Sequence, residues 1–134
     1  MVDKKNLFEQ KVEDALISTG IDFNGAILML GISGGPDSSA LLASLVKLKT
    51  TFHFVLKVAY IDHGLRQEAE QEEDFVRALS NKFSLAFESI KVDTIEYQNK
   101  HKLSQEEAAR HVRYKSLSEM GKNLNSHHIL VGHT

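Results

Sequence analysis

The fold is decided by one stretch of the sequence, Ala26-Ile27-Leu28-Met29-Leu30-Gly31-Ile32-Ser33-Gly34-Gly35-Pro36-Asp37-Ser38-Ser39. Residues 26–30 form an unbroken apolar run, which is typical of a strand buried on both faces of a parallel sheet. After the loop at 33–36, residues 37–48 place apolar side chains at helical spacing. The stretch therefore predicts a buried strand, a glycine-rich turn and the start of a helix.

The same alternation runs through the rest of the chain. Further helices are predicted over 8–19, 68–83 and 104–124, and further strands over 52–61, 85–92 and 128–132. The helix over 104–124 opens with Ser104 and Glu107, a capping box, and the alternation over 85–92 indicates a more exposed strand. The side chains expected to point inward from the second of these helices are Phe75, Val76, Leu79 and Phe83. Strands and helices that alternate with such short connections predict an α/β fold with a doubly wound parallel sheet and right-handed crossovers.

The composition limits the function classes. The 134 residues suffice for one domain or for part of one. Because cysteine is absent, a disulfide framework and a thiolate metal site are excluded within this sequence. The net charge of −2 gives no electrostatic footprint for nucleic acid. The charged start at residues 1–5 lacks the apolar core of a secretory signal, and no apolar run approaches the roughly 20 residues that span a bilayer.

The loop after the first strand has the residues of an anion-binding nest. The adjacent Gly34 and Gly35 allow the backbone to curl with its N–H groups pointing inward. The following helix adds unpaired first-turn amides and a partial positive charge. The hydroxyls of Ser33, Ser38 and Ser39 can donate to the same anion. The expected ligand is a phosphate or a pyrophosphate.

Two nucleotide-binding motifs fail at this loop, and two other interpretations stay open. A P-loop needs Gly-Lys-Ser/Thr, but no lysine occurs between residues 33 and 46. A dinucleotide fingerprint counted from Gly31 needs a glycine where Pro36 stands. Residues 31–35 match the G-x-S-x-G elbow of hydrolases, although that elbow normally follows several strands and only one helix precedes residue 26. The simplest interpretation is a capped helix in which Asp37 and Ser38 are ordinary first residues.

The loop S-G-G-x-D-S at residues 33–38 resembles the pyrophosphate loop (PP-loop) of the ATP pyrophosphatase superfamily, which splits ATP between its α and β phosphates. Three later blocks resemble motifs of one family within it, the tRNA(Ile)-lysidine synthases. They are H-G-L-R at 63–66, S-x-E-x-x-A-R-x-x-R-Y at 104–114, and G-H-x at 132–134, the start of that family's G-H-x-x-D-D. The resemblance implies a Rossmann-like adenine nucleotide alpha hydrolase (PP-loop) fold.

The resemblance also implies an activity, cofactors and partners. Enzymes of this family use ATP and Mg²⁺ to adenylate the C2 oxygen of the wobble cytidine of tRNA(Ile). The ε-amine of free lysine then displaces AMP and forms lysidine. The implied location is the cytoplasm, without a membrane partner, and a homodimer is compatible with it. The chain would be the N-terminal part of the PP-loop domain, with the remaining catalytic segment and the C-terminal tRNA-binding domains elsewhere, so that residues 1–134 alone would be inactive.

Site residues follow from the same resemblance. Asp37 would be catalytic and a ligand of Mg²⁺, Arg113 would hold the α-phosphate or the tRNA backbone, and His133 would contact phosphates or nucleoside. The main chain of Ile61 would bind adenine, and His63 would lie nearby because it follows a strand end. The cofactor-binding loop would comprise Ser33, Gly34, Gly35, Pro36, Asp37, Ser38 and Ser39. If the strand order is 3-2-1-4, the crevice lies between the first and fourth strands.

Purely structural roles are also compatible with some of these residues. Asp37 could simply complement the dipole of its helix, and Arg110 could pair on the surface with Glu106. Two rival functions also stay open. One is another superfamily enzyme, either a tRNA thiolation enzyme, which typically needs cysteines to carry sulfur, or an amide-forming synthetase. The other is a non-catalytic module that binds an adenine nucleotide.

Overall fold

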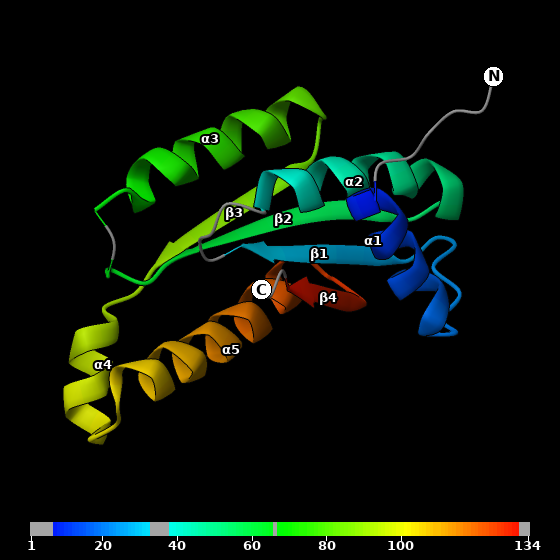
Figure 1. The fold of residues 1–134 in the computed structure, drawn as a ribbon. Coiled ribbons are helices and arrows are strands. Elements are labelled where there is room, and N and C mark those ends of the chain that lie inside the picture. Colours follow the sequence, from blue (N-terminus) through cyan, green and yellow to red (C-terminus); the bar gives the residue numbers. More distant parts are fainter. Residues whose placement is uncertain (1–6, 33–37, 66, 132–134) are drawn as a thin grey trace.

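The computed structural model describes residues 7–32, 38–65 and 67–131, with the backbone alone described for Ser38. Within these residues the strands form one parallel four-stranded sheet in the order β3-β2-β1-β4 (Figure 1). The predicted doubly wound α/β fold is confirmed. The elements are α1 (Leu7–Ser18), β1 (Ile27–Ile32), α2 (Ser38–Phe52), β2 (Val55–Asp62), α3 (Ala69–Lys82), β3 (Ala86–Lys91), α4 (Thr94–His101), α5 (Gln105–Asn123) and β4 (His128–Val131).

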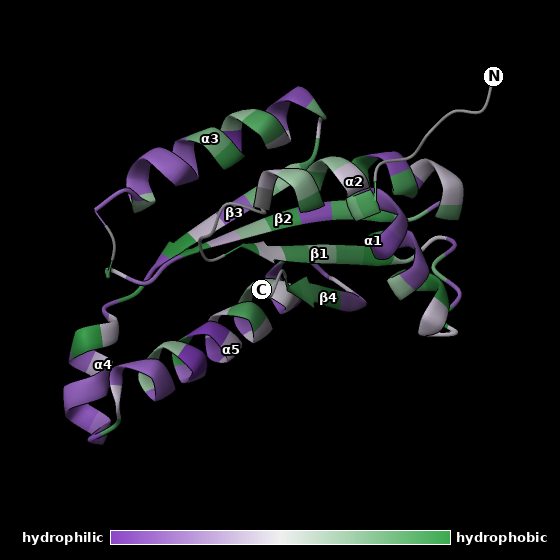
Figure 2. Ribbon diagram, viewed as in Figure 1, coloured by the Kyte–Doolittle hydropathy of each residue, from purple (hydrophilic) through white to green (hydrophobic). Residues whose placement is uncertain are grey.

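Helices cover both faces of the sheet. α1, α2 and α3 lie on one face and α5 on the other (Figure 1). Leu28 and Leu30 of β1 point into the core under α1 to α3, whereas Met29 points toward α5, and all three are fully buried. This explains the continuous apolar colour of β1 in Figure 2. β3 is an edge strand and is more exposed, as the sequence predicted.

Gly31 allows α5 to lie close against β1. A Cβ atom at this position would overlap the Cδ2 atom of Leu117 on α5. The first glycine of the G-x-S-x-G match therefore has a role in packing. Arg113 precedes Leu117 by about one helical turn, and α5 runs back from the carboxyl edge of the sheet to the start of β4 (Figure 1). The contact at Gly31 thus sets how far Arg113 lies from the end of β1.

The predicted start of the second strand was wrong. α2 continues to Phe52, and β2 begins only at Val55. The Phe52 ring packs edge-on against the Phe23 ring with 6.3 Å between centroids. The chain then leaves the helix at His53, which has a left-handed φ of 60°. An aromatic residue fits a helical face as well as a strand, so periodicity alone did not separate the two.

The predicted inward face of α3 was partly wrong. Phe75 is 56% exposed, whereas Val76 is 2% exposed and Ser80 is fully buried. The inward face is therefore centred on Val76 and Ser80, about a quarter turn away from Phe75. The ends of α3 lie within one residue of the prediction.

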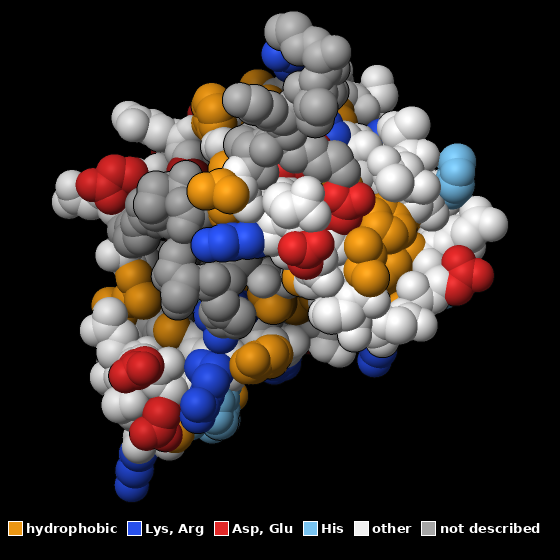
Figure 3. Space-filling view, turned by 45° about the vertical axis from the view of Figure 1, so that its right-hand side comes forward, with side chains coloured by type: hydrophobic (Ala, Val, Ile, Leu, Met, Phe, Trp, Pro, Cys, Tyr) orange, Lys and Arg blue, Asp and Glu red, His pale blue; other side chains and the backbone are white. Residues whose placement is uncertain are grey.

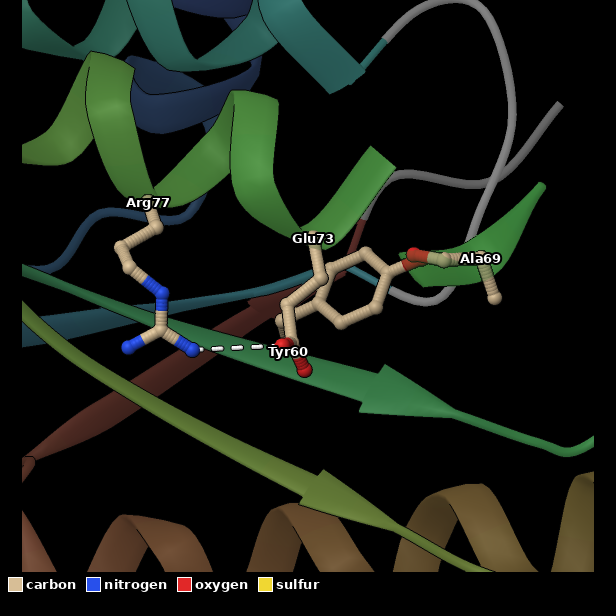
Figure 4. A network of polar contacts seen from close by, with 4 residues as sticks. All are labelled: Tyr60, Ala69, Glu73 and Arg77. Carbon is tan, nitrogen blue, oxygen red and sulfur yellow. Dashed lines mark hydrogen bonds and ion pairs between the residues drawn. The ribbon is translucent and has the colours of Figure 1, made fainter. Parts of the chain in front are cut away.

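The start of α3 is fixed over β2 by polar contacts (Figure 4). The buried Tyr60 hydroxyl lies 3.2 Å from the carbonyl oxygen of Ala69 and 2.9 Å from Glu72 Oε1, and both oxygens are acceptors. One turn later along α3, Arg77 donates to the Glu73 carboxylate at 3.2 Å. These contacts place the first turn of α3 near the carboxyl end of β2.

α4 was not predicted. Asp93 caps it by accepting a hydrogen bond from the Glu96 N–H at 3.0 Å, and Lys102 ends it in the left-handed conformation with φ of 55°. The helix is short and polar, and it packs against α5. The predicted cap of α5 is confirmed, because the Ser104 hydroxyl oxygen accepts from the Glu107 N–H at 3.2 Å.

Candidate functional site

The parallel strands end together at one edge of the sheet, and the strand order reverses there between β1 and β4. Ligands of doubly wound sheets bind at this point, outside the carboxyl ends of the strands. Residues 33–37 and 132–134 lie outside the described residues. The predictions for Ser33, Gly34, Gly35, Pro36, Asp37 and His133 therefore remain predictions, as does that for the side chain of Ser38.

α2 starts at this edge and directs its N-terminus toward it (Figure 1). The first-turn N–H groups of a helix have no partner within the helix, and the helix end has a partial positive charge. Ser39, in that first turn, is half-buried. The described part of the predicted nest is thus in the place and orientation that favour an anion.

The turn after β2 is held by the residues around His63. The Asp62 carboxylate accepts a hydrogen bond from the Gly64 N–H at 2.8 Å. Gly64 has a left-handed φ of 71°, and a Cβ there would lie 3.0 Å from the carbonyl oxygen of Val92. Asp62 and Gly64, on either side of His63, therefore shape this turn.

His63 has an unpaired nitrogen beside the edge. Its side chain is half-buried, and Nδ1 is buried without a hydrogen-bond partner among the described residues. Burial lowers the pKa of His63, and the Arg113 guanidinium lowers it further, while the Asp62 carboxylate opposes both effects. The imidazole is therefore neutral near pH 7, with Nδ1 available to a ligand or to water.

Arg113 lies near His63 although the two residues belong to motifs far apart in the sequence. Its side chain is half-buried, its guanidinium lies 5.3 Å from the Tyr114 ring centroid, and Nε finds no partner in the part of the chain that the structure describes. Arg110 and Glu106 are exposed, and the described residues show no ion pair between them. Of the two arginines in the motif, Arg113 is the one placed at the edge.

Ile61 has a buried side chain, 1% exposed, that faces α5. Among the described residues, the pairing of β2 with β1 reaches Tyr60, opposite Ile32, and Ile61 pairs with Ile90 of β3.

The sequence reasoning missed Thr94. Thr94 is fully buried at the start of α4, its N–H donates to the His63 carbonyl oxygen at 3.3 Å, and its hydroxyl has no partner in the described ranges. Thr94 could have been found only by predicting α4, because its contact with His63 joins the segment after β3 to the segment after β2.

Two kinds of feature are absent from the described residues, a cluster of metal ligands and a membrane-spanning helix. Among the described residues no group of three or more His, Cys, Asp or Glu could hold a metal ion, and the predicted ligand Asp37 lies outside them. In the same part of the chain no helix is long and apolar enough to cross a bilayer.

A family model described as "PP-loop domain" matches residues 5–134. The chain belongs to the PP-loop family. This ATP-utilising family accounts for the glycine-rich loop between β1 and α2 and for the four-stranded core.

Several curated relatives are named tRNA(Ile)-lysidine synthase. The chain is 39% identical over 106 residues to a protein named tRNA(Ile)-lysidine synthase from Petrotoga mobilis, covering 79% of the chain and 34% of that protein. It is 36% identical to the protein of that name from Thermosipho africanus, covering 94% of the chain and 29% of that protein. For the protein from Dehalococcoides mccartyi the identity is 34%, with 96% and 27% covered. The chain thus spans about a third of the length of these relatives.

A solved structure with the same fold bears a different name. The U34-tRNA thiolase NcsA from Methanococcus maripaludis, described with a 4Fe-4S cluster, aligns with a TM-score of 0.75 at 15% identity. The alignment covers 94% of the chain and 44% of NcsA. At this identity the likeness shows the PP-loop fold alone.

Proposed function

We propose that the protein acts as a tRNA(Ile)-lysidine synthase, a ligase that uses ATP to join lysine to the wobble cytidine of tRNA(Ile). The observation that carries the proposal is the similarity, at 30–39% identity, to proteins of that name over most of the chain. The position of His63 and Arg113, from two of the four motif blocks, at the carboxyl edge supports it. The cytoplasm, where tRNA is modified, is the proposed location.

In the first step the C2 oxygen of the cytidine attacks the α-phosphorus of ATP, and pyrophosphate leaves. Negative charge moves onto the leaving group, so the amides at the N-terminus of α2 and the loop at 33–39 would stabilise the transition state more than the ground state. Arg113 would supply a fixed planar cation to the α-phosphate or to the RNA backbone. His63, being neutral, would offer a hydrogen bond without a second positive charge.

Asp37, Ile61 and His133 complete the proposed nucleotide site. Asp37 would bind Mg²⁺, an ion that proteins usually hold with one or two carboxylates together with substrate phosphates. The backbone of Ile61, near the carboxyl end of β2, would read the adenine. His133 follows β4 in the sequence and would contact the phosphates or the nucleoside.

In the second step the ε-amine of lysine attacks C2 of the adenylated cytidine and AMP leaves. The groups that bind lysine are proposed to lie beyond this segment, which would be the N-terminal part of the PP-loop domain. The lengths of the relatives support this division.

The test uses the protein expressed from its whole reading frame, an isoleucine tRNA transcript with a wobble cytidine, ATP and lysine. We expect tRNA-dependent release of pyrophosphate and AMP, and lysidine detected by mass spectrometry of nucleosides. Thiolated nucleoside formed with a sulfur donor would instead support the thiolation alternative, which the lack of cysteine in this sequence disfavours. Nucleotide binding without pyrophosphate release would indicate a binding module.

The role of Asp37 has its own test. Asp37→Ala should lower tRNA-dependent ATP consumption at least about 100-fold. The Mg²⁺ ion would lose its carboxylate ligand and would no longer stabilise the charge that develops on the departing pyrophosphate. Asp22→Ala, in the loop before β1, is the matched control. Unchanged ATP consumption in Asp37→Ala would remove the metal role.

A further inference from the structure

Three rings meet where α4 packs against α5. The Tyr97 ring lies 4.2 Å from the His101 ring with 37° between their planes, and 6.4 Å from the His111 ring at 61°. Tyr97 is half-buried, whereas both histidines are exposed. Tyr97, His101 and His111, here called the ring cluster, therefore present flat unsaturated surfaces to solvent.

A hollow of about 380 Å³ opens beside the ring cluster. This is within the size range of small-molecule sites in proteins. Lysine side chains line it from both helices, Lys100 from α4 and Lys115 from α5, together with the carboxylates of Asp93, Glu96 and Glu119. The residues that matter here are Glu96, Tyr97, Lys100, His101, Lys115 and Glu119.

The charge of the chain is unevenly distributed. Residues 91–124 contain seven Lys or Arg and five Asp or Glu, whereas the rest of the chain contains nine and thirteen. In Figure 3, Lys and Arg side chains lie beside histidine and acidic side chains at the lower end of the molecule, where α4 and α5 lie. This part of the molecule is the one with the best charge for an RNA backbone.

The α4–α5 pair also lies next to the reacting edge. α4 begins three residues after β3 ends, and it projects beyond the carboxyl ends of β2 and β3 (Figure 1). Thr94, its first residue, is bonded to the backbone of His63. RNA that contacts this surface could therefore place an unstacked base at the edge of the sheet.

We propose that the ring cluster, with Lys100 and Lys115, is a contact surface for a single-stranded loop of the tRNA, one base of which stacks on the rings. Single-stranded bases are commonly recognised by stacking on Tyr or His, with nearby cations bound to phosphate. The inference rests on the proposed function, because it takes tRNA as the substrate. It adds an RNA contact within this segment, whereas the resemblance places tRNA binding in other domains.

The test measures the Kd of the whole protein for an isoleucine tRNA transcript at several salt concentrations. Tyr97→Leu and His101→Ala should each raise the Kd about 5-fold or more, as expected for loss of one stacked base, while Tyr97→Phe should keep it. Lys100→Gln with Lys115→Gln should reduce the slope of log K against log salt by up to about 1 per lysine. Lys82→Gln, an exposed lysine at the other end of the sheet, is the matched control. ATP binding should not change in any variant.

The outcomes separate the two proposals. If the wild type forms lysidine but the ring variants bind tRNA as it does, the contact surface is refuted and the proposed reaction stands. If the wild type binds tRNA through these residues but forms no lysidine, the surface stands and the reaction is refuted. If the wild type binds no tRNA, or if Tyr97→Phe weakens binding as much as Tyr97→Leu, the surface is refuted.

Discussion

At the scale of single residues, Arg113 and Arg110 show how two neighbouring arginines of one motif come to differ. Arg113 is half-buried beside His63 with an unpaired Nε, and Arg110 is exposed. A buried donor without a partner is costly, so it is retained where a ligand or water completes it. The sequence already favoured Arg113 as the functional arginine, and the burial of the two side chains agrees with that preference.

Arg113→Lys should lower kcat for lysidine formation about 10- to 100-fold, because lysine cannot reproduce a fixed planar donor. Arg110→Lys should leave kcat within about 2-fold of the wild type. Steady-state assays on the whole protein would check both. Equal kcat values for Arg113→Lys and the wild type would contradict phosphate binding by the guanidinium.

His63 makes stability depend on pH. Its pKa in the folded chain lies below the ordinary value of 6.5, so the unfolded chain binds the proton more readily. The free energy of unfolding therefore includes a contribution that is complete above about pH 6.5 and is lost as the pH falls through the lowered pKa. Urea unfolding between pH 5 and 8 should show this rise with pH weakened in His63→Asn, and retained in His53→Asn, which lies in an exposed turn. Parallel curves for the wild type and His63→Asn would contradict the assignment.

At the scale of elements, the distance between α5 and β1 is set at Gly31. Gly31→Ala should destabilise the fold by about 1–3 kcal/mol, because the added methyl group overpacks the Leu117 contact. Combining it with Leu117→Val should recover part of that loss, since the smaller side chain makes room. Chemical denaturation measures both effects. Additive losses in the double variant would show that the two side chains do not compete for the same space.

The C-terminus of α5 is fixed in a similar way, by a residue from another element. Lys57 of β2 donates from Nζ to the Leu124 carbonyl oxygen at 2.8 Å. A cation at the C-terminal end of a helix also interacts favourably with the helix dipole. No periodicity in the sequence links Lys57 to Leu124, so only the tertiary structure identifies this contact.

At the scale of the whole molecule, the chain spans only about a third of the length of the relatives to which it is similar. Residues 1–134 alone should bind ATP weakly and form no lysidine. Isothermal titration with ATP and nucleoside analysis after incubation with tRNA, ATP and lysine would check this. Lysidine produced by this segment alone would show that it holds the complete catalytic site.

The elements with strong local signals were predicted well. The apolar run of β1, the cap at Ser104 and the extent of α3 depend on residues near one another in the sequence, and all three are confirmed. α4 escaped prediction because it is short and polar and gains its stability from packing on α5. The prediction that Phe75 points inward was wrong because α3 packs on the sheet through the face that holds Val76 and Ser80, and this packing depends on residues distant in the sequence.

The sequence by itself determined the alternation of strands and helices, the glycine-rich loop at the end of β1 and the family to which the chain belongs, since these depend on local spacing and motif order. Only the tertiary structure decided that His63 and Arg113 lie together, that Gly31 makes room for Leu117, and that the rings of α4 and α5 meet. Such contacts join residues distant in the chain, and they form only when many weak packing interactions bring whole elements together.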